Sequence, residues 1–324
     1  MSCFNPNYME CFVDEYTGQL SYSFNGNARY QNPLTFGKFS DLAENGSYKF
    51  LVPCRHCLGC HIDYSRDWAN RLCIELNDMK KAVYLTLTYN QENVPLTDDG
   101  VMTLSVRDTQ LFLKRLRKRF SNVRIRYYLA GEYGPIGRRP HYHAIIFGFS
   151  LADLTDLRIV DYNELGQPLY TSDVISSVWD KGFITLGEVN YRTCAYVSRY
   201  VLKKHYSYNK SDLQGALPEF NTSSRRPGIG LLNYDKILDR DTDILSIYTG
   251  DDVHTFPLPH SFIRKGLTDE NYVDKCQNIS YNKRDKSNDR VCSDLLWTEK
   301  SYDDYLKDNY RELYNRIKLL KERR

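Results

Sequence analysis

The order of the periodic segments is the feature that most constrains the fold of this chain. Between residues 61 and 206, stretches with apolar residues three and four apart alternate with stretches rich in β-branched and aromatic residues. The first pattern predicts helices over residues 61–80, 105–120, 171–180 and 190–204. The second predicts strands over residues 81–89, 124–132, 141–149 and 182–189. After the first helix, the expected order is therefore strand, helix, strand, strand, helix, strand, with one more helix behind it.

This order is typical of an α+β fold of the ferredoxin-like, split βαβ kind, with a central antiparallel sheet. The segment GPIGRRP has the punctuation of a turn, so the second and third strands are expected to form an antiparallel hairpin. Outside this core, we expect an irregular Cys-containing segment at the N-terminus and an extension at the C-terminus. That extension is expected to contain a polar linker over residues 280–290 and a terminal helix. The predicted division is residues 1–60, 61–206 and 207–324.

Basic residues are concentrated in one part of the chain, although the net charge is only +3. Residues 107–126 hold many lysines and arginines and a single acidic residue, Asp108. Such a block predicts a polyanionic partner, and it also fits an ordinary solvated helix face. The abundant tyrosines suit stacking on bases as well as an aromatic core. The predicted DNA contacts are Arg115, Lys118, Arg119, Arg138, Arg139, Arg225 and Arg226.

The sequence has no stretch typical of a secretory signal and no apolar run long enough to cross a membrane. We therefore expect an intracellular protein with no membrane partner. The nine cysteines are then expected to be reduced, which favours metal binding over disulfide bonds.

Two histidines lie two residues apart in the third predicted strand. Side chains at this spacing leave a strand on the same face, so His141 and His143 are expected to point the same way. Glu132 ends the preceding strand and is expected nearly opposite His141. Two imidazoles and one carboxylate would hold Mg²⁺ or Mn²⁺ with open positions for a phosphate. The same ligands also describe non-haem iron sites, and ordinary structural histidines are a further alternative.

Two tyrosines, Tyr196 and Tyr200, lie one turn apart on the last predicted helix of the core. Lys203 and Lys204 follow them on the same helix, and the apolar residues of its other side are expected in the core. A phenol has a pKa of ~10 and becomes a useful nucleophile when a metal polarises the phosphate and a cation lies near. In a chain so rich in tyrosine, such a pair is also expected by chance.

Three cysteines form a C-x2-C-x2-C pattern ahead of the first predicted helix: Cys54, Cys57 and Cys60. A structural zinc site needs a fourth ligand in tetrahedral geometry. The candidates for it are Cys3, which we favour, Cys11, His61 and Cys73. Thiols without a metal remain an alternative. An iron–sulfur cluster is another, although the Cys-Pro that usually follows this spacing is missing.

In order along the chain, YLTLTY, GEYG with RPHYHAIIFG, and YVSRYVLKK resemble the three motifs of HUH endonucleases that initiate rolling-circle replication. The similarity is greatest to the initiators of small single-stranded DNA phages, the microviruses and particularly the gokushovirus group. PCRHCLGC and SRRPGIG also resemble that group. The motifs cover about residues 54–230.

The resemblance implies an HUH nuclease that nicks one DNA strand at the phage origin. It identifies His141 and His143 with the HUH pair, Tyr196 and Tyr200 with the paired nucleophiles, and Lys203 or Lys204 with the accompanying lysine. One tyrosine would hold the 5′ phosphate and free a 3′ hydroxyl as primer, and the second would later rejoin the strand. Tyr142 stands where the motif usually has an aliphatic residue, and we expect it on the core face. The third ligand, here Glu132, varies within the superfamily.

The resemblance also implies partners and a compartment. They are single-stranded and supercoiled double-stranded phage DNA, with the host replicative helicase and polymerase, in the cytoplasm of a bacterium. A single-strand transposase with the same core is an alternative, whereas conjugative relaxases usually carry the tyrosine before the histidine motif. A non-catalytic zinc-bearing nucleic-acid-binding protein is the alternative from another class. A non-haem iron oxygenase does not fit, because those sites normally lie in all-β barrels.

Overall fold

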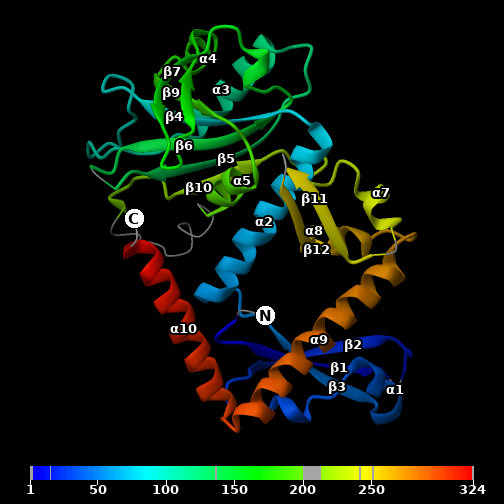
Figure 1. Cartoon of the computed structure of the whole chain (residues 1–324). Helices are drawn as coiled ribbons and strands as arrows, with labels where there is room; N and C mark the ends of the chain where they lie inside the picture. The colour runs from blue at the N-terminus through cyan, green and yellow to red at the C-terminus, as the bar shows by residue number, and fades with distance from the viewer. Residues whose placement is uncertain are drawn as a thin grey trace. The chain divides into compact units, whose positions relative to one another are not determined.

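The computed structural model describes residues 3–14, 16–135, 137–199, 213–240, 242–249 and 252–322. The chain divides into two compact units (Figure 1). The first joins residues 1–64 to residues 263–324, and the second comprises residues 65–262.

An antiparallel sheet with the strand order β2-β1-β3 forms the centre of the first unit. Its strands are β1 (Asn7–Val13), β2 (Leu20–Asn27) and β3 (Ser47–Val52). Between β2 and β3 lie the short helices η1 (Pro33–Thr35), η2 (Phe39–Asp41) and α1 (Leu42–Asn45). Two long helices, α9 (Val273–Thr298) and α10 (Tyr302–Glu322), complete the unit. The expected terminal helix is thus present.

Two expectations about this unit were wrong. Residues 1–60 are not irregular, and residues 280–290 are not a linker but lie inside α9. Helix α9 has no apolar stripe, so its sequence pattern resembles that of a solvated segment. It packs through other contacts, with the Arg284 guanidinium 4.3 Å from the centre of the Phe50 ring and Tyr281 stacked on an aromatic ring of η2. The sheet and the helix stabilise each other although they are far apart in the sequence, and local periodicity does not reveal such contacts.

The second unit contains a larger antiparallel sheet, with the order β10-β5-β6-β4-β9-β8-β7 among the described residues. Its elements in chain order are α2 (Leu58–Met79, which begins in the first unit), β4 (Ala82–Tyr89), α3 (Val106–Arg119), β5 (Arg126–Tyr133), β6 (Pro140–Phe147), η3 (Leu151–Asp153), β7 (Arg158–Tyr162), β8 (Pro168–Thr171), α4 (Asp173–Trp179), β9 (Gly182–Gly187), α5 (Tyr191–Ser198), β10 (Phe220–Ser223), α7 (Tyr234–Leu238), β11 (Ile244–Thr249), β12 (Asp252–Pro257) and α8 (His260–Gly266), whose last residues belong to the first unit.

The four predicted strands form the middle of this sheet, in the order β5-β6-β4-β9. The connection from β4 through α3 to β5 passes over β6, and the connection from β6 through α4 to β9 passes over β4. This is the split βαβ arrangement expected from the sequence. The start of α3 is also as predicted, because Ser105 Oγ accepts a hydrogen bond from the Asp108 amide at 3.1 Å.

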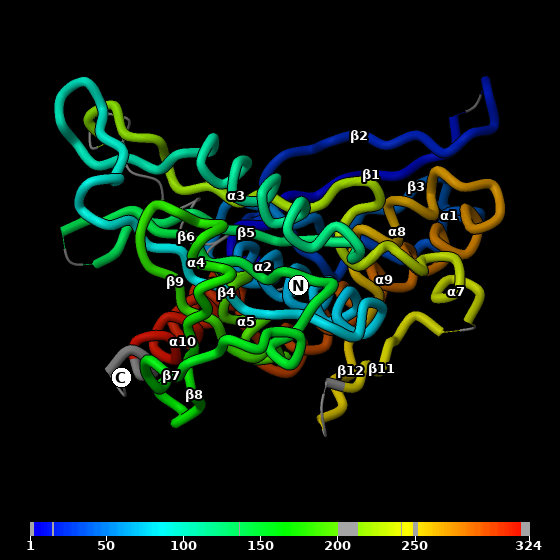
Figure 2. Tube along the Cα trace, turned by 90° about the horizontal axis from the view of Figure 1, so that it is seen from above, coloured from blue at the N-terminus to red at the C-terminus, as the bar shows by residue number. Residues whose placement is uncertain are grey.

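Three strands of this sheet were not predicted. The β7–β8 hairpin stands at one edge (Figure 2), and β10 pairs with β5 at the other. The side chains of β7 are all exposed and β10 is short and polar, so neither shows the alternation that marks a half-buried strand. Because β10 follows residue 206, the predicted division there does not coincide with the edge of the sheet.

The two faces of the larger sheet are covered by different helices. The α3 face packs against α3 and α4, in a core that includes Leu85, Leu129, Tyr142 and Ile146 from the strands. On the α2 face, Tyr128 packs against Trp68 of α2 with ring centres 4.9 Å apart. Helix α5 joins α2 there, through hydroxyls of Ser198 and Ser65 that lie 3.2 Å apart. Alternate residues of each strand point to these two faces, which assigns every later residue to one of them.

In the described part of the chain, no helix combines the length and the apolar content needed to cross a bilayer.

Candidate functional site

A cluster of one carboxylate and two imidazoles lies on the α2 face. Glu132 of β5 is directly opposite His141 of β6 in the antiparallel register. Glu132 Oε1 lies 2.9 Å from His141 Nε2 and 3.0 Å from His143 Nε2. One donor atom from each residue lies within 4.8 Å of the others, so the three can converge on one cation. The predicted convergence of these residues is therefore confirmed.

The outer nitrogens of both imidazoles have hydrogen-bond partners that orient the rings. His141 Nδ1 lies 3.1 Å from the Arg139 carbonyl oxygen, and His143 Nδ1 lies 2.6 Å from the Tyr84 hydroxyl. For Nε2 to bind a metal, Nδ1 must carry the proton and donate it to these oxygens. Burial raises the pKa of Tyr84, so its phenol stays neutral. Thr86 Oγ1 donates to the same hydroxyl at 3.0 Å.

Sequence reasoning missed the role of Tyr84 and Thr86. The signal was present in YLTLTY, because Tyr84, Thr86 and Thr88 alternate with buried leucines and so share the α2 face. That segment was interpreted only as a buried strand. Its polar side forms the floor beside the histidines.

The cluster is buried at one end and open at the other. Glu132 and His143 are almost completely buried, whereas 17% of the His141 side chain is exposed. A ligand would therefore approach from the side of His141. Two imidazole nitrogens and one carboxylate oxygen fit a divalent cation that keeps positions open for a substrate.

Tyr196 extends from α5 toward this cluster. The helix starts at Asn190, whose side chain accepts a hydrogen bond from the Thr193 amide at 3.0 Å, as its predicted cap should. Cys194 and Val197 are buried on the core side, while Tyr196 is 42% exposed. The Tyr196 ring centre lies 5.9 Å from that of His143. Its orientation away from the apolar side is as predicted. Tyr200, Lys203 and Lys204 lie outside the described residues.

Tyr142, between the two histidines, points to the opposite face as expected. It is fully buried, and its hydroxyl lies 2.9 Å from the Tyr89 hydroxyl and accepts a hydrogen bond from the Ser105 amide at 2.7 Å. Burial raises the pKa of Tyr142 to about 12, so the phenol remains neutral. The larger residue thus fits the core, and the histidines keep their face.

Three of the arginines predicted to contact DNA make contacts within the protein. Arg115 forms an ion pair with Asp180 and so links α3 to the end of α4. Arg139 donates to the Tyr89 carbonyl from Nε at 3.1 Å and from Nη2 at 2.9 Å. Arg138 lies 5.3 Å from the centre of the Tyr133 ring.

The other predicted DNA contacts are exposed. Lys118 and Arg119 lie on the outer side of α3, and Arg225 and Arg226 follow β10. The two groups belong to neighbouring parts of the α3 face. Their role in DNA binding remains a prediction.

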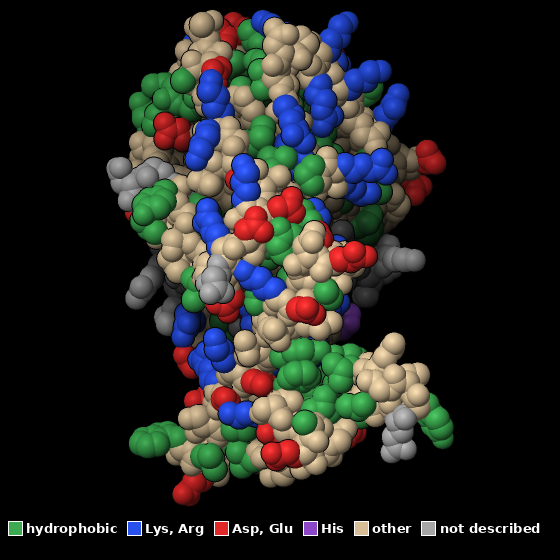
Figure 3. Space-filling model, turned by 90° about the vertical axis from the view of Figure 1, so that its right-hand side faces the viewer, with side chains coloured by type: hydrophobic (Ala, Val, Ile, Leu, Met, Phe, Trp, Pro, Cys, Tyr) green, Lys and Arg blue, Asp and Glu red, His purple; other side chains and the backbone are tan. Residues whose placement is uncertain are grey.

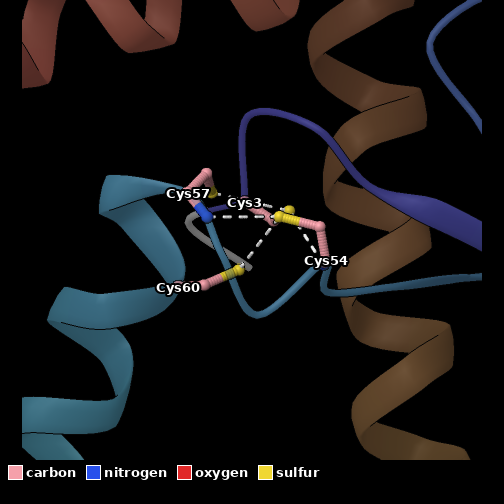
Figure 4. A group of neighbouring side chains, drawn as sticks. All are labelled: Cys3, Cys54, Cys57 and Cys60. Carbon is pink, nitrogen blue, oxygen red and sulfur yellow. Dashed lines mark hydrogen bonds between the residues drawn. The ribbon is translucent and has the colours of Figure 1, made fainter. Parts of the chain in front are cut away.

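Four cysteines come together in the first unit (Figure 4). Cys3 precedes β1, Cys54 follows β3, and Cys57 and Cys60 flank the start of α2. The sulfur atoms of Cys3 and Cys57 are 3.8 Å apart, those of Cys54 and Cys60 3.9 Å, and all four lie within 4.8 Å of one another. A tetrahedral zinc site with Zn–S bonds of ~2.3 Å places its sulfurs about 3.8 Å apart. The expectation that Cys3 completes the set is confirmed.

Each of the four sulfurs accepts a hydrogen bond from a backbone amide. The donors are the amides of Phe4 to Cys57, Cys54 to Cys3, Arg55 to Cys60 and Cys57 to Cys54, at 3.3–3.4 Å. Hydrogen bonds of this kind stabilise thiolates, which are the form that binds a metal. The pKa of Cys57 is lowered, first by hydrogen bonding with Cys3 and then with Cys60. The donor set and its surroundings therefore fit a tetrahedral metal ion.

The chain is similar in sequence to known replication proteins. The model of the replication-associated protein ORF2 family matches residues 82–205, a range that contains Glu132, both histidines and Tyr196. The replication-associated protein ORF2 of Spiroplasma virus 4 is 33% identical over 292 residues, which cover 86% of this chain and 88% of that protein.

Two further relatives are similar over shorter stretches. The replication-associated protein VP4 of Bdellovibrio phage phiMH2K is 34% identical over 183 residues, or 54% of this chain and 55% of that protein. The replication-associated protein ORF4 of Chlamydia phage 1 is 28% identical over 161 residues, or 48% of this chain and 39% of that protein. No solved structure matches the chain.

Proposed function

Because this chain belongs to the replication-associated protein ORF2 family of phage proteins, we propose that it is an HUH endonuclease that starts rolling-circle replication. It nicks one strand at the phage origin, stays linked to the 5′ phosphate through tyrosine, and later rejoins the strand. The observation that carries this proposal is the position of Tyr196, 5.9 Å from the ring of His143 in a cluster suited to a divalent metal.

The residues divide the reaction between them. Glu132, His141 and His143 would hold Mg²⁺ or Mn²⁺, which when bound polarises the scissile phosphate and stabilises the charge that develops on it. The Tyr196 hydroxyl oxygen attacks phosphorus, a Tyr–O–P bond forms, and the bond from phosphorus to the 3′ oxygen breaks. The phenol proton passes to solvent, and the 3′ oxygen leaves as a hydroxyl. The result is a free 3′ end, from which a host polymerase can extend.

Strand joining follows from the same chemistry. The phosphotyrosine bond replaces one phosphodiester by another, so attack by a 3′ hydroxyl restores the DNA strand and the free phenol. A second nucleophile would allow two successive transfers without release of the end, and we propose Tyr200 for it. Lys203 or Lys204 would be the cation close to the nucleophiles, as in the motif they resemble.

A covalent adduct is the direct test of this proposal. Purified protein mixed with supercoiled phage DNA and Mn²⁺ should give a protein–DNA adduct that survives SDS, and Tyr196→Phe/Tyr200→Phe should remove it completely. Tyr191→Phe, on the same helix, is the matched control and should form the adduct at the normal rate. An adduct that persists in the double variant would refute these nucleophiles. No adduct from protein that binds DNA and metal would favour a non-catalytic binding protein.

Phe183 is expected to hold a base beside the metal cluster. In the sheet, Thr88 of β4 pairs with His141 on one side and with Phe183 of β9 on the other, so all three lie in one row on the α2 face. The Phe183 side chain is 69% exposed, which suits stacking on a base of the strand to be cut. Phe183→Ala should raise KM for a short single-stranded substrate about tenfold, because base stacking contributes ~1–3 kcal/mol.

Two further variants make the Phe183 result specific. Phe183→Trp should keep a normal KM, because it keeps an aromatic surface. Phe24→Ala removes a ring of similar exposure, 64%, from the first unit and should have no effect. An unchanged KM in Phe183→Ala would show that the ring does not contact the substrate.

A further inference from the structure

A pocket of about 560 Å³ lies on the α3 face, at the edge of the sheet formed by β10. Figure 3 shows Lys and Arg side chains gathered on one side of the second unit. The pocket is lined by residues of three separate segments: Gln110 and Arg117 of α3, residues 124–127 at the start of β5, and residues 222–226 in and after β10. Four of the lining residues that bring charge into it are Arg117, Arg124, Arg225 and Arg226.

The charge of these four arginines is available to a ligand. Among the described residues, none of them forms an ion pair, and Arg117 lies 5.6 Å from the centre of the Tyr127 ring. Thr222 and Ser224 add hydroxyl groups to the same wall. Pockets of ~300–1,000 Å³ that take small molecules are mostly apolar, whereas this wall is cationic and hydroxylated. Arginine side chains in this arrangement match the oxygens of phosphate groups.

A buried ion pair holds the loop that carries Arg225 and Arg226. Arg126 and Glu75 form this pair on the α2 side of the sheet, with 4% and 0% of their side chains exposed. The Arg126 Nη2 donates to the carbonyl oxygens of Pro227 and Gly228, each at 3.0 Å.

The other partner of the pair holds the end of the same loop. Glu75 Oε2 accepts a hydrogen bond from the Gly230 amide at 2.7 Å, and Arg71 Nε donates to the Ile229 carbonyl at 3.1 Å. Gly230 has φ +77°, and a Cβ there would come within 2.8 Å of the Arg71 carbonyl oxygen. The loop backbone is thus fixed from α2 before any ligand arrives, which reduces the entropy lost on binding.

We propose that this pocket binds backbone phosphates of DNA next to the segment that is cut. The proposal rests on the proposed nicking function. Glu132, His141 and His143 lie on the α2 face, while Arg117, Thr222 and Ser224 belong to the α3 face, so one short stretch of a strand cannot occupy both. The pocket would therefore position a flanking segment. Because its contacts are with phosphates, they set register and affinity and carry no base sequence.

A salt titration of DNA binding tests this. Arg225→Ala/Arg226→Ala removes two exposed cations, and it should lower the affinity for a 40-base-pair duplex at least tenfold. It should also reduce the slope of log K against log [salt] by about 1.8, because each phosphate contact to duplex DNA contributes ~0.9. Arg225→Lys/Arg226→Lys should restore the slope and only part of the affinity, since lysine keeps the charge without the fork of donors. Unchanged slope and affinity in the alanine variant would overturn the proposal.

The matched control is Arg311→Ala/Arg316→Ala, which removes two exposed arginines of α10 in the first unit. It should bind the duplex with the slope of the unaltered protein. An equal fall in slope with this control would also overturn the proposal, because the effect would then be one of net charge.

Adduct formation separates this proposal from the proposed function. With single-stranded 12-mers tiled across the phage origin, the Arg225→Ala/Arg226→Ala variant should form the tyrosine adduct at the normal rate. Loss of the 12-mer adduct would place these arginines at the cleavage site and overturn the idea of a flanking segment. If the unaltered protein forms no adduct but its duplex binding depends on the arginines, the nuclease proposal fails and the phosphate pocket stands.

Discussion

Replacing His143 with alanine should reduce DNA cleavage at least about a thousandfold while leaving DNA binding intact. The imidazole is almost completely buried, and its Nε2 lies 3.0 Å from the Glu132 carboxylate. Without it, the cluster keeps two of its three ligands, and the stabilisation of the phosphate, worth several kcal/mol, is lost. Each ~1.4 kcal/mol lost from that stabilisation slows the reaction tenfold. The rate of adduct formation on phage DNA with Mn²⁺ measures this.

His260→Ala is the matched control for that experiment. It removes an exposed histidine of the same unit, far along the chain from the cluster, and should cleave at the normal rate. Binding of the same DNA, measured without metal, should be unchanged in both variants. If His143→Ala loses binding and cleavage equally, the histidine supports the structure and does not hold a catalytic metal.

The purified chain should contain one zinc ion, and Cys57→Ser should lose both the metal and the fold of the first unit. The four sulfurs already lie at the spacing of a tetrahedral site, and each accepts an amide hydrogen bond. Binding of a structural zinc contributes on the order of 10 kcal/mol to folding in small domains. Elemental analysis gives the metal content, and thermal unfolding with and without a chelator gives the loss of stability.

Cys292→Ser is the control for the cysteine experiment. Cys292 belongs to α9 in the same unit, is not one of the four, and donates to the Pro33 carbonyl at 3.5 Å. It should leave the metal content at one per chain. Iron in place of zinc, visible as absorbance in the near ultraviolet and visible range, would change the identity of the site. A chain that unfolds at the same temperature with and without chelator would refute a structural metal.

Local pattern was enough to predict much of the candidate active site. The spacing of His141 and His143 alone places both imidazoles on one face, because strand side chains alternate. The turn between β5 and β6 then sets the register that brings Glu132 opposite His141. Helical period likewise separated Tyr196 from the buried Cys194 and Val197. All of these follow from residues that are close neighbours in the sequence.

Elements whose stability depends on distant partners were missed or misassigned. Helix α9 looks polar along its length, and only the aromatic and Arg284 contacts with the N-terminal sheet explain how it packs. The short strand β10 has no pattern of its own and exists because β5 offers it an unpaired edge. Arg115 sits in a basic block, yet its partner Asp180 is 65 residues away.

The sequence by itself determined which residues share a face, a turn or a short motif. It therefore determined the strand and helix order of the core, the two histidines and the C-x2-C-x2-C run. Only the tertiary structure decided which distant groups meet: Cys3 with the other three cysteines, Tyr84 with His143, and Arg225 with Arg117 around one pocket. The physical reason is that periodicity records the direction of each side chain relative to its own backbone. Contacts across long loops depend instead on how whole elements pack.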